Sequence, residues 1–165
     1  MMRYSLADIH NTVTLEQELN YIRSYLAIQK IRFSERLDYE ILCDNTILPL
    51  SIPFFSLQPL VENSIEHGLL NKASGGKLTL TCTRQPAYDL LCVEDNGIGI
   101  AEDILVQLRA TLLCEQTEVP ERHVGLYNCY NRFRLLFGNN LSFSISAKWQ
   151  TGTRVTIKLY HHTAF

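Results

Sequence analysis

The sequence predicts an α+β fold, a two-layer α/β sandwich in which a mixed, mostly antiparallel sheet carries helices on one face. Helical and strand patterns follow one another in the order helix, strand, helix, two strands, two helices, two strands. The last two strand patterns are joined by the turn KWQTG, which is typical of an antiparallel hairpin. The length of 165 residues suits one domain with a substantial core.

The composition is that of an ordinary soluble globular protein, with 46% hydrophobic and 19% charged residues. A formal net charge of -2 gives no general attraction to nucleic acid or to an anionic membrane, so we expect no nucleic-acid partner. No stretch approaches the roughly 18 apolar residues of a membrane span, and the N-terminus lacks the order of a signal peptide. Five cysteines without a C-x-x-C pattern predict reduced thiols, several of them in the core, in a cytosolic compartment.

The N-terminal part of the chain predicts one long helix, from Thr14 to about Arg36, and then a strand. Thr14 and Gln17 form a capping-box pattern at the start of the helix. One side of the helix carries an apolar stripe, made of Leu15, Leu19, Ile22, Leu26 and Phe33. The stripe needs a partner surface, which is another helix, the sheet of this domain or a segment outside this chain. The alternation over 37–44 predicts a half-buried strand.

The middle of the chain predicts a helix from about Ser56 to His67, closed by Gly68. Two strands follow. The segment 77–83 alternates between apolar and polar residues, which predicts a strand with one buried face. The segment 89–93 is almost continuously apolar, so we expect it in the centre of its sheet.

The C-terminal part predicts two helices and a hairpin. The helices cover about 102–113 and 126–137, and the second ends at Gly138. A polar connector separates them. The strands 141–147 and 153–160 both alternate and form the hairpin.

The glycine-rich segments do not match the common nucleotide fingerprints. In GIGIAE, Glu102 stands where a dinucleotide-binding motif needs its third glycine. In NKASGGKL, Asn71 replaces the first glycine of a P-loop and Leu78 replaces its Ser or Thr. The histidines have neither zinc-site nor catalytic-triad spacing. Taken alone, VEDNGIGI (93–100) fits a strand ending in a turn as well as it fits a ligand site.

Three other segments also carry residues suited to a ligand, each with a simpler structural explanation. In SLQPLVENSIEHG, Glu62 and Glu66 are four residues apart and lie off the apolar face of the helix. Either both are solvated, or a nearby cation relieves the repulsion between their like charges. Gly125 stands where a helix begins. The free backbone amides there can bind an anion, or the segment is only the turn that starts the helix. Gly152 and Thr153 open the last strand, where a hairpin turn favours them in any case.

Taken in order, four segments of the chain resemble the ATP-binding domain of sensor histidine kinases, with its Bergerat fold, in the superfamily of gyrase, the Hsp90 chaperones and MutL. They are LQPLVENSIEHG for the N-box and EDNGIGI, HVGLYN and GTRVTI for three glycine boxes. The closer resemblance is to kinases of the LytS/YesM type, in the phrases RYSL, VTLEQELNYIRSYLAIQKIRF, QPLVEN and NRFRLLFG. The resemblance covers nearly the whole chain.

The resemblance implies a nucleotide site for ATP. Asp95 matches the acid that accepts a hydrogen bond from the adenine amino group. Gly97 and Gly99 match glycines that let the backbone approach the nucleotide closely. Thr153 matches a threonine near the adenine pocket.

On the phosphate side, Asn63 matches the N-box asparagine that coordinates Mg²⁺ between the ATP phosphates. Glu62 beside it is a second candidate metal ligand. His67 follows one turn later and could reach the nucleotide. Gly125 and Leu126 match the second glycine box, whose backbone N–H groups face the phosphates.

Several positions depart from the family pattern. The segment 101–122 matches a mobile ATP lid, but His123 at its exit replaces a glycine found in many relatives, which implies a stiffer exit. Glu66 replaces a lysine, which implies one phosphate contact fewer. Pro59 stands where the gyrase, Hsp90 and MutL branches have the glutamate that activates water. The resemblance therefore favours phosphoryl transfer to a histidine over ATP hydrolysis.

The resemblance divides the chain into 1–36, the end of the dimerisation and phosphoacceptor region, and 37–165, the catalytic ATP-binding domain. His10 lacks the neighbouring Pro and Phe of the family's acceptor, so we expect the acceptor histidine outside this chain. The implied whole protein is a membrane-anchored bacterial sensor kinase with this part in the cytoplasm. It is a homodimer, and its partner is a response regulator of the LytTR or AraC type. The alternatives are an ATPase of the same superfamily and a degenerate, non-catalytic nucleotide-binding module.

Overall fold

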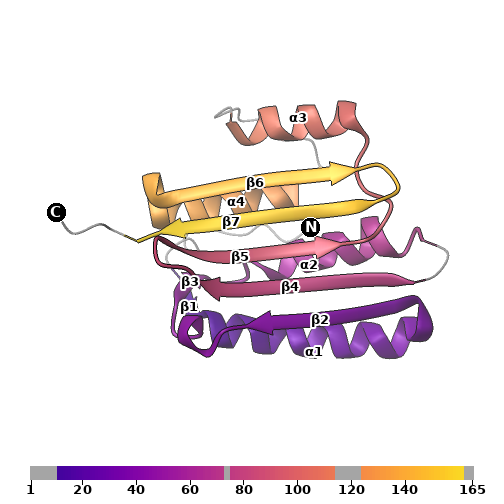
Figure 1. Ribbon diagram of the computed structural model, residues 1–165, viewed down its shortest axis with the longest axis horizontal. Coiled ribbons are helices and arrows are strands. Elements are labelled where there is room, and N and C mark those ends of the chain that lie inside the picture. Colours follow the sequence, from indigo (N-terminus) through magenta and orange to yellow (C-terminus); the bar gives the residue numbers. More distant parts are fainter. Residues whose placement is uncertain (1–10, 73–74, 114–123, 162–165) are drawn as a thin grey trace.

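The computed structural model describes residues 11–72, 75–113 and 124–161, which form a five-stranded sheet with helices packed on it (Figure 1). The strands lie in the order β2, β4, β5, β7, β6. Their bounds are Leu37–Cys43, Gly76–Arg84, Tyr88–Asp95, Gly152–Tyr160 and Leu141–Lys148. Only the β2–β4 pair of this sheet is parallel. The mixed, mostly antiparallel sheet is confirmed, as is the central place of β5.

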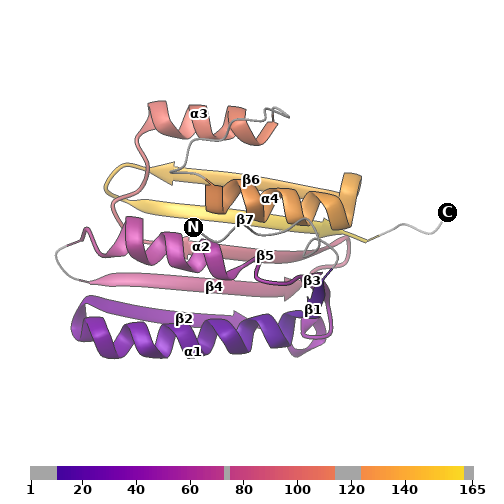
Figure 2. The ribbon, with the colours of Figure 1, turned by 180° about the vertical axis from the view of Figure 1, so that it is seen from behind.

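Three helices cover one face of the sheet: α1 (Leu15–Phe33), α2 (Gln58–Asn63) and α4 (Val124–Phe137). Figures 1 and 2 show α3 (Glu102–Leu113) beyond the β6 edge instead. The predicted two-layer sandwich is therefore confirmed, with α3 extending it sideways. Within the described ranges, no helix has the length and apolarity needed to span a membrane.

The apolar stripe of α1 finds its partner inside this domain. Leu15, Leu19, Ile22 and Leu26 are fully buried in the same core as the sheet strands. The predicted capping box is present, because the Gln17 N–H donates to Thr14 Oγ1 at 3.2 Å and the Thr14 N–H donates to Gln17 Oε1 at 3.0 Å. The predicted helix to Arg36 ends as a 3₁₀ turn over Ser34–Arg36.

The second helix differs from its prediction at both ends. It begins at Gln58, and it continues through Gly68 as a π-helical turn, Ser64–Leu69. The prediction that Gly68 closes the helix is therefore wrong. Gly68 lies against Asp95 instead, since a Cβ at this position would stand 2.9 Å from Asp95 Oδ1.

The start of α2 is capped by a residue distant in sequence. The backbone N–H groups of Phe55, Leu57 and Gln58 donate to the carboxylate of Glu18 in α1, at 3.0, 3.0 and 3.3 Å. Glu18 is only 1% exposed. A carboxylate that accepts from three amides stabilises a helix N-terminus, where these N–H groups lack helical partners.

A small second sheet was not predicted. Strands β1 (Thr12–Thr14) and β3 (Ser51–Pro53) pair in antiparallel fashion. Each has three residues, too few to show an alternating pattern. Beside this sheet the Leu15 N–H donates to the Leu50 carbonyl at 2.8 Å, so the start of α1 is fixed next to the segment that leads into α2.

The four cysteines that the structure describes are free thiols: Cys43, Cys82, Cys92 and Cys129. Cys82 and Cys129 are buried, and burial raises the pKa of both thiols. Cys114 lies outside the described residues. Cys82 and Cys129 are therefore core residues, whereas Cys43 and Cys92 are only partly buried.

Candidate functional site

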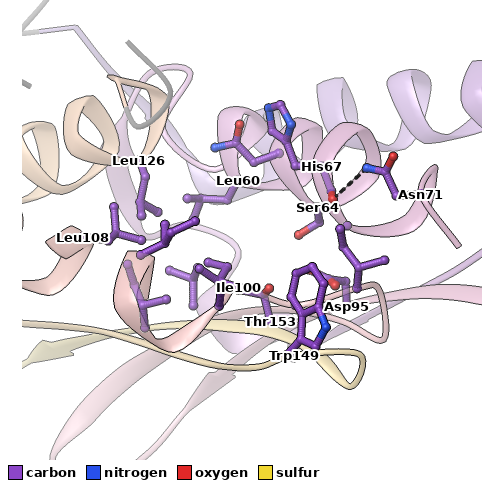
Figure 3. Close-up of a pocket in the computed structure, with 18 residues that line it drawn as sticks. Leu60, Ser64, His67, Asn71, Asp95, Ile100, Leu108, Leu126, Trp149 and Thr153 are labelled. Atoms are coloured by element: carbon purple, nitrogen blue, oxygen red, sulfur yellow. Dashed lines mark hydrogen bonds between the residues drawn. The ribbon is translucent and has the colours of Figure 1, made fainter. Parts of the chain in front are cut away.

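A cavity of about 340 Å³ is lined by residues of α3, the start of α4 and the strands β5, β6 and β7 (Figure 3). Its other wall is the α2 segment, by which we mean α2 together with the π-helical turn Ser64–Leu69 that continues it. Six of the eight residues predicted to bind nucleotide line it: Asn63, His67, Asp95, Gly99, Leu126 and Thr153. They come from four segments that are far apart in the sequence. The fold therefore brings most of the predicted site into one place.

The other two predicted residues, Gly97 and Gly125, stand directly behind the cavity wall. A Cβ at Gly97 would overlap the backbone of Gly68, and the N–H of the following residue donates to the Gly68 carbonyl at 3.2 Å. A Cβ at Gly125 would lie 3.4 Å from Asn63 Nδ2. Both glycines thus allow segments of the cavity wall to pack closely.

Gly99 lines the cavity, and its backbone conformation requires a glycine. Its φ is +69°, and a Cβ there would overlap the carbonyl of Lys148 in the β6–β7 hairpin. The sequence suggested that Gly97 and Gly99 make room for the nucleotide. Close contacts within the protein already account for both glycines.

Asp95 is the only carboxylate among the described residues that line the cavity, and it is 4% exposed. Burial raises the pKa of Asp95, while hydrogen bonds from the Gly97 N–H, the Ser64 side chain and the Thr153 backbone oppose that rise. The Gly97 N–H lies 2.9 Å from Oδ1. None of the ion pairs found between described residues involves Asp95. A buried acceptor of this kind suits a hydrogen-bond donor on a ligand.

The polar residues of the α2 segment separate into two groups. Asn63 and His67 line the cavity, one helical turn apart. Glu62 accepts from Gln58 Nε2 at 3.1 Å and does not line the cavity. Burial raises the pKa of Tyr25 in α1 to about 12, with further contributions from Glu62 and Glu66. These two glutamates are therefore close enough to α1 to act on Tyr25, and they lie outside the cavity wall.

No group of three or more His, Cys, Asp or Glu side chains that could hold a metal ion occurs among residues 11–72, 75–113 and 124–161. Asn63, the last residue of α2, lies on the cavity wall beside Gly125 at the start of α4. Its amide oxygen is a hard ligand. This donor set fits a Mg²⁺ ion whose remaining ligands come from phosphates and water. The role of Glu62 as a second ligand stays a prediction.

The two polar residues of VEDNGIGI without an assigned role stabilise the local structure. Asn96 accepts from the Lys77 N–H at 2.7 Å through Oδ1 and donates to the Gly75 carbonyl at 3.0 Å through Nδ2. Glu94 pairs with Arg154 on the neighbouring strand, at 2.7 and 2.8 Å. Asn96 therefore fixes the start of β4, and Glu94 links β5 to β7.

Sequence reasoning missed most of the apolar lining of the cavity, apart from Leu126 and Gly99. Leu60, Ile100, Leu108 and Trp149 all face it (Figure 3). Leu108 belongs to α3, which lies in the segment matched to an ATP lid. The rest of that segment from residue 114 onward lies outside the described residues, and so do His123 and His10. A leucine or isoleucine in an amphipathic pattern gives no sign that it borders a cavity. Only the place of Trp149 beside Gly152 and Thr153 offered a signal.

Comparison with known proteins agrees with this geometry. The family model described as histidine kinase-, DNA gyrase B- and HSP90-like ATPase matches residues 55–163. A second model, described as histidine kinase, matches residues 1–37. The sensor protein kinase HptS of Staphylococcus aureus (strain USA300) is 35% identical over 159 residues, which are 96% of this chain and 30% of that protein. The chain thus spans less than a third of the length of the curated relatives it matches.

Two solved histidine kinase domains share this fold. The catalytic domain of the histidine kinase ThkA superposes with a TM-score of 0.64 at 12% identity, over 91% of this chain and 96% of that one. The histidine kinase domain of a blue-light activated kinase from Erythrobacter litoralis superposes with a TM-score of 0.60 at 20% identity, over 90% and 61%. The chain belongs to the family of histidine kinase-, DNA gyrase B- and HSP90-like ATPases and, within it, to the histidine kinase catalytic domains.

Proposed function

We propose that the cavity binds Mg-ATP, with Asp95 as the residue that recognises adenine. The observation that carries this proposal is the buried Asp95 carboxylate on the wall of a cavity, without a cationic partner among the described residues. An adenine amino group is a donor that such an acceptor can bind. Thr153 lies opposite Asp95 in the β5–β7 register, so it borders the same part of the cavity.

The phosphates lie toward the other end of the cavity in this proposal. Asn63 and Leu126 line that part, and the first turn of the 14-residue helix α4 begins beside Asn63. Unpaired N–H groups at a helix start attract anions. Mg²⁺ would bind the Asn63 amide oxygen and the phosphates, where it neutralises charge on the transferred group. His67, on the same helical flank, is a further contact to the nucleotide.

The reaction that we propose is transfer of the γ-phosphoryl group to a histidine on a segment outside this chain. Pro59 occupies the site of the water-activating glutamate in the ATPase branches, and its Cβ lies 3.9 Å from where a Cβ of Gly125 would stand. Asp95 is engaged at the adenine end, and the described cavity wall offers no second carboxylate as a base. Positioning and charge neutralisation are sufficient for phosphoryl transfer.

The whole protein that we propose is a bacterial sensor kinase of the LytS/YesM type. Residues 1–36 are the end of its dimerisation and phosphoacceptor region, and residues 37–165 are its catalytic domain. The protein is anchored in the membrane with this part in the cytoplasm, and it acts as a homodimer. A response regulator of the LytTR or AraC type receives the phosphoryl group. The similarity to the sensor protein kinase HptS supports this placement.

The test uses ATP labelled on its γ-phosphate. We expect this chain to bind the nucleotide with Mg²⁺ but to acquire no label, and to transfer label to the matching dimerisation region of a LytS/YesM-type kinase when that is supplied. Steady ATP turnover by this chain alone, lost on changing Glu62, would favour the ATPase alternative. Absence of binding at millimolar nucleotide would favour the non-catalytic module.

A further inference from the structure

Trp149 is the only tryptophan of the chain, and it lines the cavity while remaining 55% exposed. It stands in the turn between β6 and β7. Leaving a large aromatic ring in water forgoes the stabilisation that its burial would give. The exposed ring therefore offers contact area to a ligand that enters the cavity.

The turn that carries Trp149 is held against the segment that carries Asp95. The Gln150 N–H donates to the Ile98 carbonyl at 2.6 Å. Gly99 packs against the Lys148 carbonyl, and Gly152 packs against the backbone of Asp95, in each case without room for a Cβ. The backbone of Trp149, in the β6–β7 turn, is therefore fixed relative to Asp95 at the end of β5.

The opposite side of the cavity is formed by the α2 segment. Figure 3 shows Ser64 and His67 on that helical side, and Trp149, Thr153 and Asp95 on the strand side. The Asn71 side chain donates to the His67 carbonyl at 3.1 Å, which holds the end of this wall. A flat ring that enters between these walls therefore has both Asp95 and Trp149 within the wall that it faces.

We propose that Trp149 stacks on the base of the bound nucleotide. This inference rests on the proposed function and deepens it, because it divides base recognition between two residues. Stacking is nearly independent of the base, since every base has a π-face. Asp95 discriminates between bases, because a carboxylate accepts from an amino group and repels a carbonyl oxygen. Trp149 thus supplies affinity, and Asp95 supplies the preference for adenine.

The experiment is calorimetry with Mg²⁺ and non-hydrolysable analogues of ATP and of inosine triphosphate. Trp149→Ala should weaken binding of both analogues by about tenfold. Trp149→Phe should keep most of the affinity, because it retains an aromatic face. Asp95→Asn should instead narrow the preference for adenine over hypoxanthine. An affinity of Trp149→Ala within twofold of the unchanged chain would overturn the inference.

The indole also reports directly on its own contact. Saturating ATP analogue should quench the fluorescence of the single tryptophan, and an unchanged spectrum at saturation would also overturn the inference. Tyr160→Ala is the matched control, because Tyr160 is an exposed aromatic residue at the far end of β7 and should leave affinity unchanged. If the unchanged chain binds neither analogue, the proposed function is wrong. If the unchanged chain binds them and Trp149→Ala binds them with equal affinity, only the stacking proposal is wrong.

Discussion

Strand β5 has a buried aspartate near each end, and the two have opposite surroundings. Asp89 is 3% exposed and Asp95 is 4% exposed. Burial alone would raise the pKa of Asp89, but the hydrogen bonds and charges of Arg84 and His161 outweigh burial and lower it. Burial raises the pKa of Asp95, and its hydrogen bonds only partly oppose this.

The difference separates a carboxylate that is paired within the protein from one that faces a cavity. Asp89 has its partners within the protein, with Arg84 Nε at 2.8 Å and His161 Nε2 at 3.2 Å. Asp95 faces a cavity and keeps acceptor capacity for a partner that is not part of the protein. A buried charge without a cation costs stability, so a ligand that donates to it recovers part of that cost.

Asp95→Asn should give the largest effect, on nucleotide affinity. Loss of a charge-assisted hydrogen bond should weaken binding of an ATP analogue by about 1.5 to 3 kcal/mol, roughly ten- to hundredfold. Calorimetry with Mg²⁺ measures it. Chemical denaturation without nucleotide is the control, because a cooperative unfolding transition shows that the variant is folded. Unchanged affinity would mean that Asp95 does not contact the base.

Asp89→Asn should act on stability and leave binding unchanged. The free energy of unfolding should fall by about 1.5 kcal/mol, because two charge-assisted hydrogen bonds are weakened. The loss stays moderate since the Arg84 side chain is 43% exposed and water can replace the lost partner. Urea denaturation measures the change. An equal loss of nucleotide affinity would erase the distinction between the two ends of β5.

Glu18→Gln should sharpen the comparison with a third buried carboxylate. Glu18 has neither a cavity nor a cation as its main partner, and accepts from three backbone N–H groups at the start of α2. Replacement of one oxygen by an NH₂ group should lower the free energy of unfolding by about 1 kcal/mol. Thermal unfolding is the readout. A melting temperature equal to that of the unchanged chain would show that these amides do not need the carboxylate.

The pH dependence of stability should differ in sign between the two aspartates. The pKa of Asp89 lies below the unfolded value of 3.8, so its stabilisation is present above 3.8 and is lost as pH falls through the lower folded pKa. The pKa of Asp95 lies above 3.8, so its contribution is present below 3.8 and is lost as pH rises through the folded pKa. Urea denaturation at a series of pH values gives the free energy of unfolding as a function of pH. Asp89→Asn should make this free energy depend less on pH below 3.8, and Asp95→Asn should make it depend less on pH just above 3.8. Parallel curves for both variants would contradict these shifts.

The sequence predicted most of the fold because local patterns determined most of it. Alternation identified four of the five long strands, and a continuous apolar run identified the fifth, β5. The capping box of Thr14 and Gln17 is present as predicted. The ends of α2 could not be predicted in the same way. Its start depends on Glu18, about forty residues away, and its π-helical end places Gly68 against Asp95.

The polar residues of the cavity wall were predicted better than its apolar ones, of which only Leu126 and Gly99 were named in advance. The family resemblance placed Asn63, Asp95 and Thr153, which the fold brings to one cavity. Trp149 stands beside Gly152 and Thr153 in the sequence, but its place on the cavity wall depends on how the β6–β7 turn packs on Ile98 and Gly99. Contacts between distant segments carry no local signal, so they had to come from the structure.

The most direct test is a calorimetric titration of this chain, in the presence of Mg²⁺, with non-hydrolysable analogues of ATP and GTP. We expect the ATP analogue to bind at one site per chain. The GTP analogue should bind at least about tenfold more weakly, because the guanine carbonyl would face the Asp95 carboxylate. No heat of binding at millimolar ATP analogue, or equal affinity for the two nucleotides, would contradict an adenine site at Asp95.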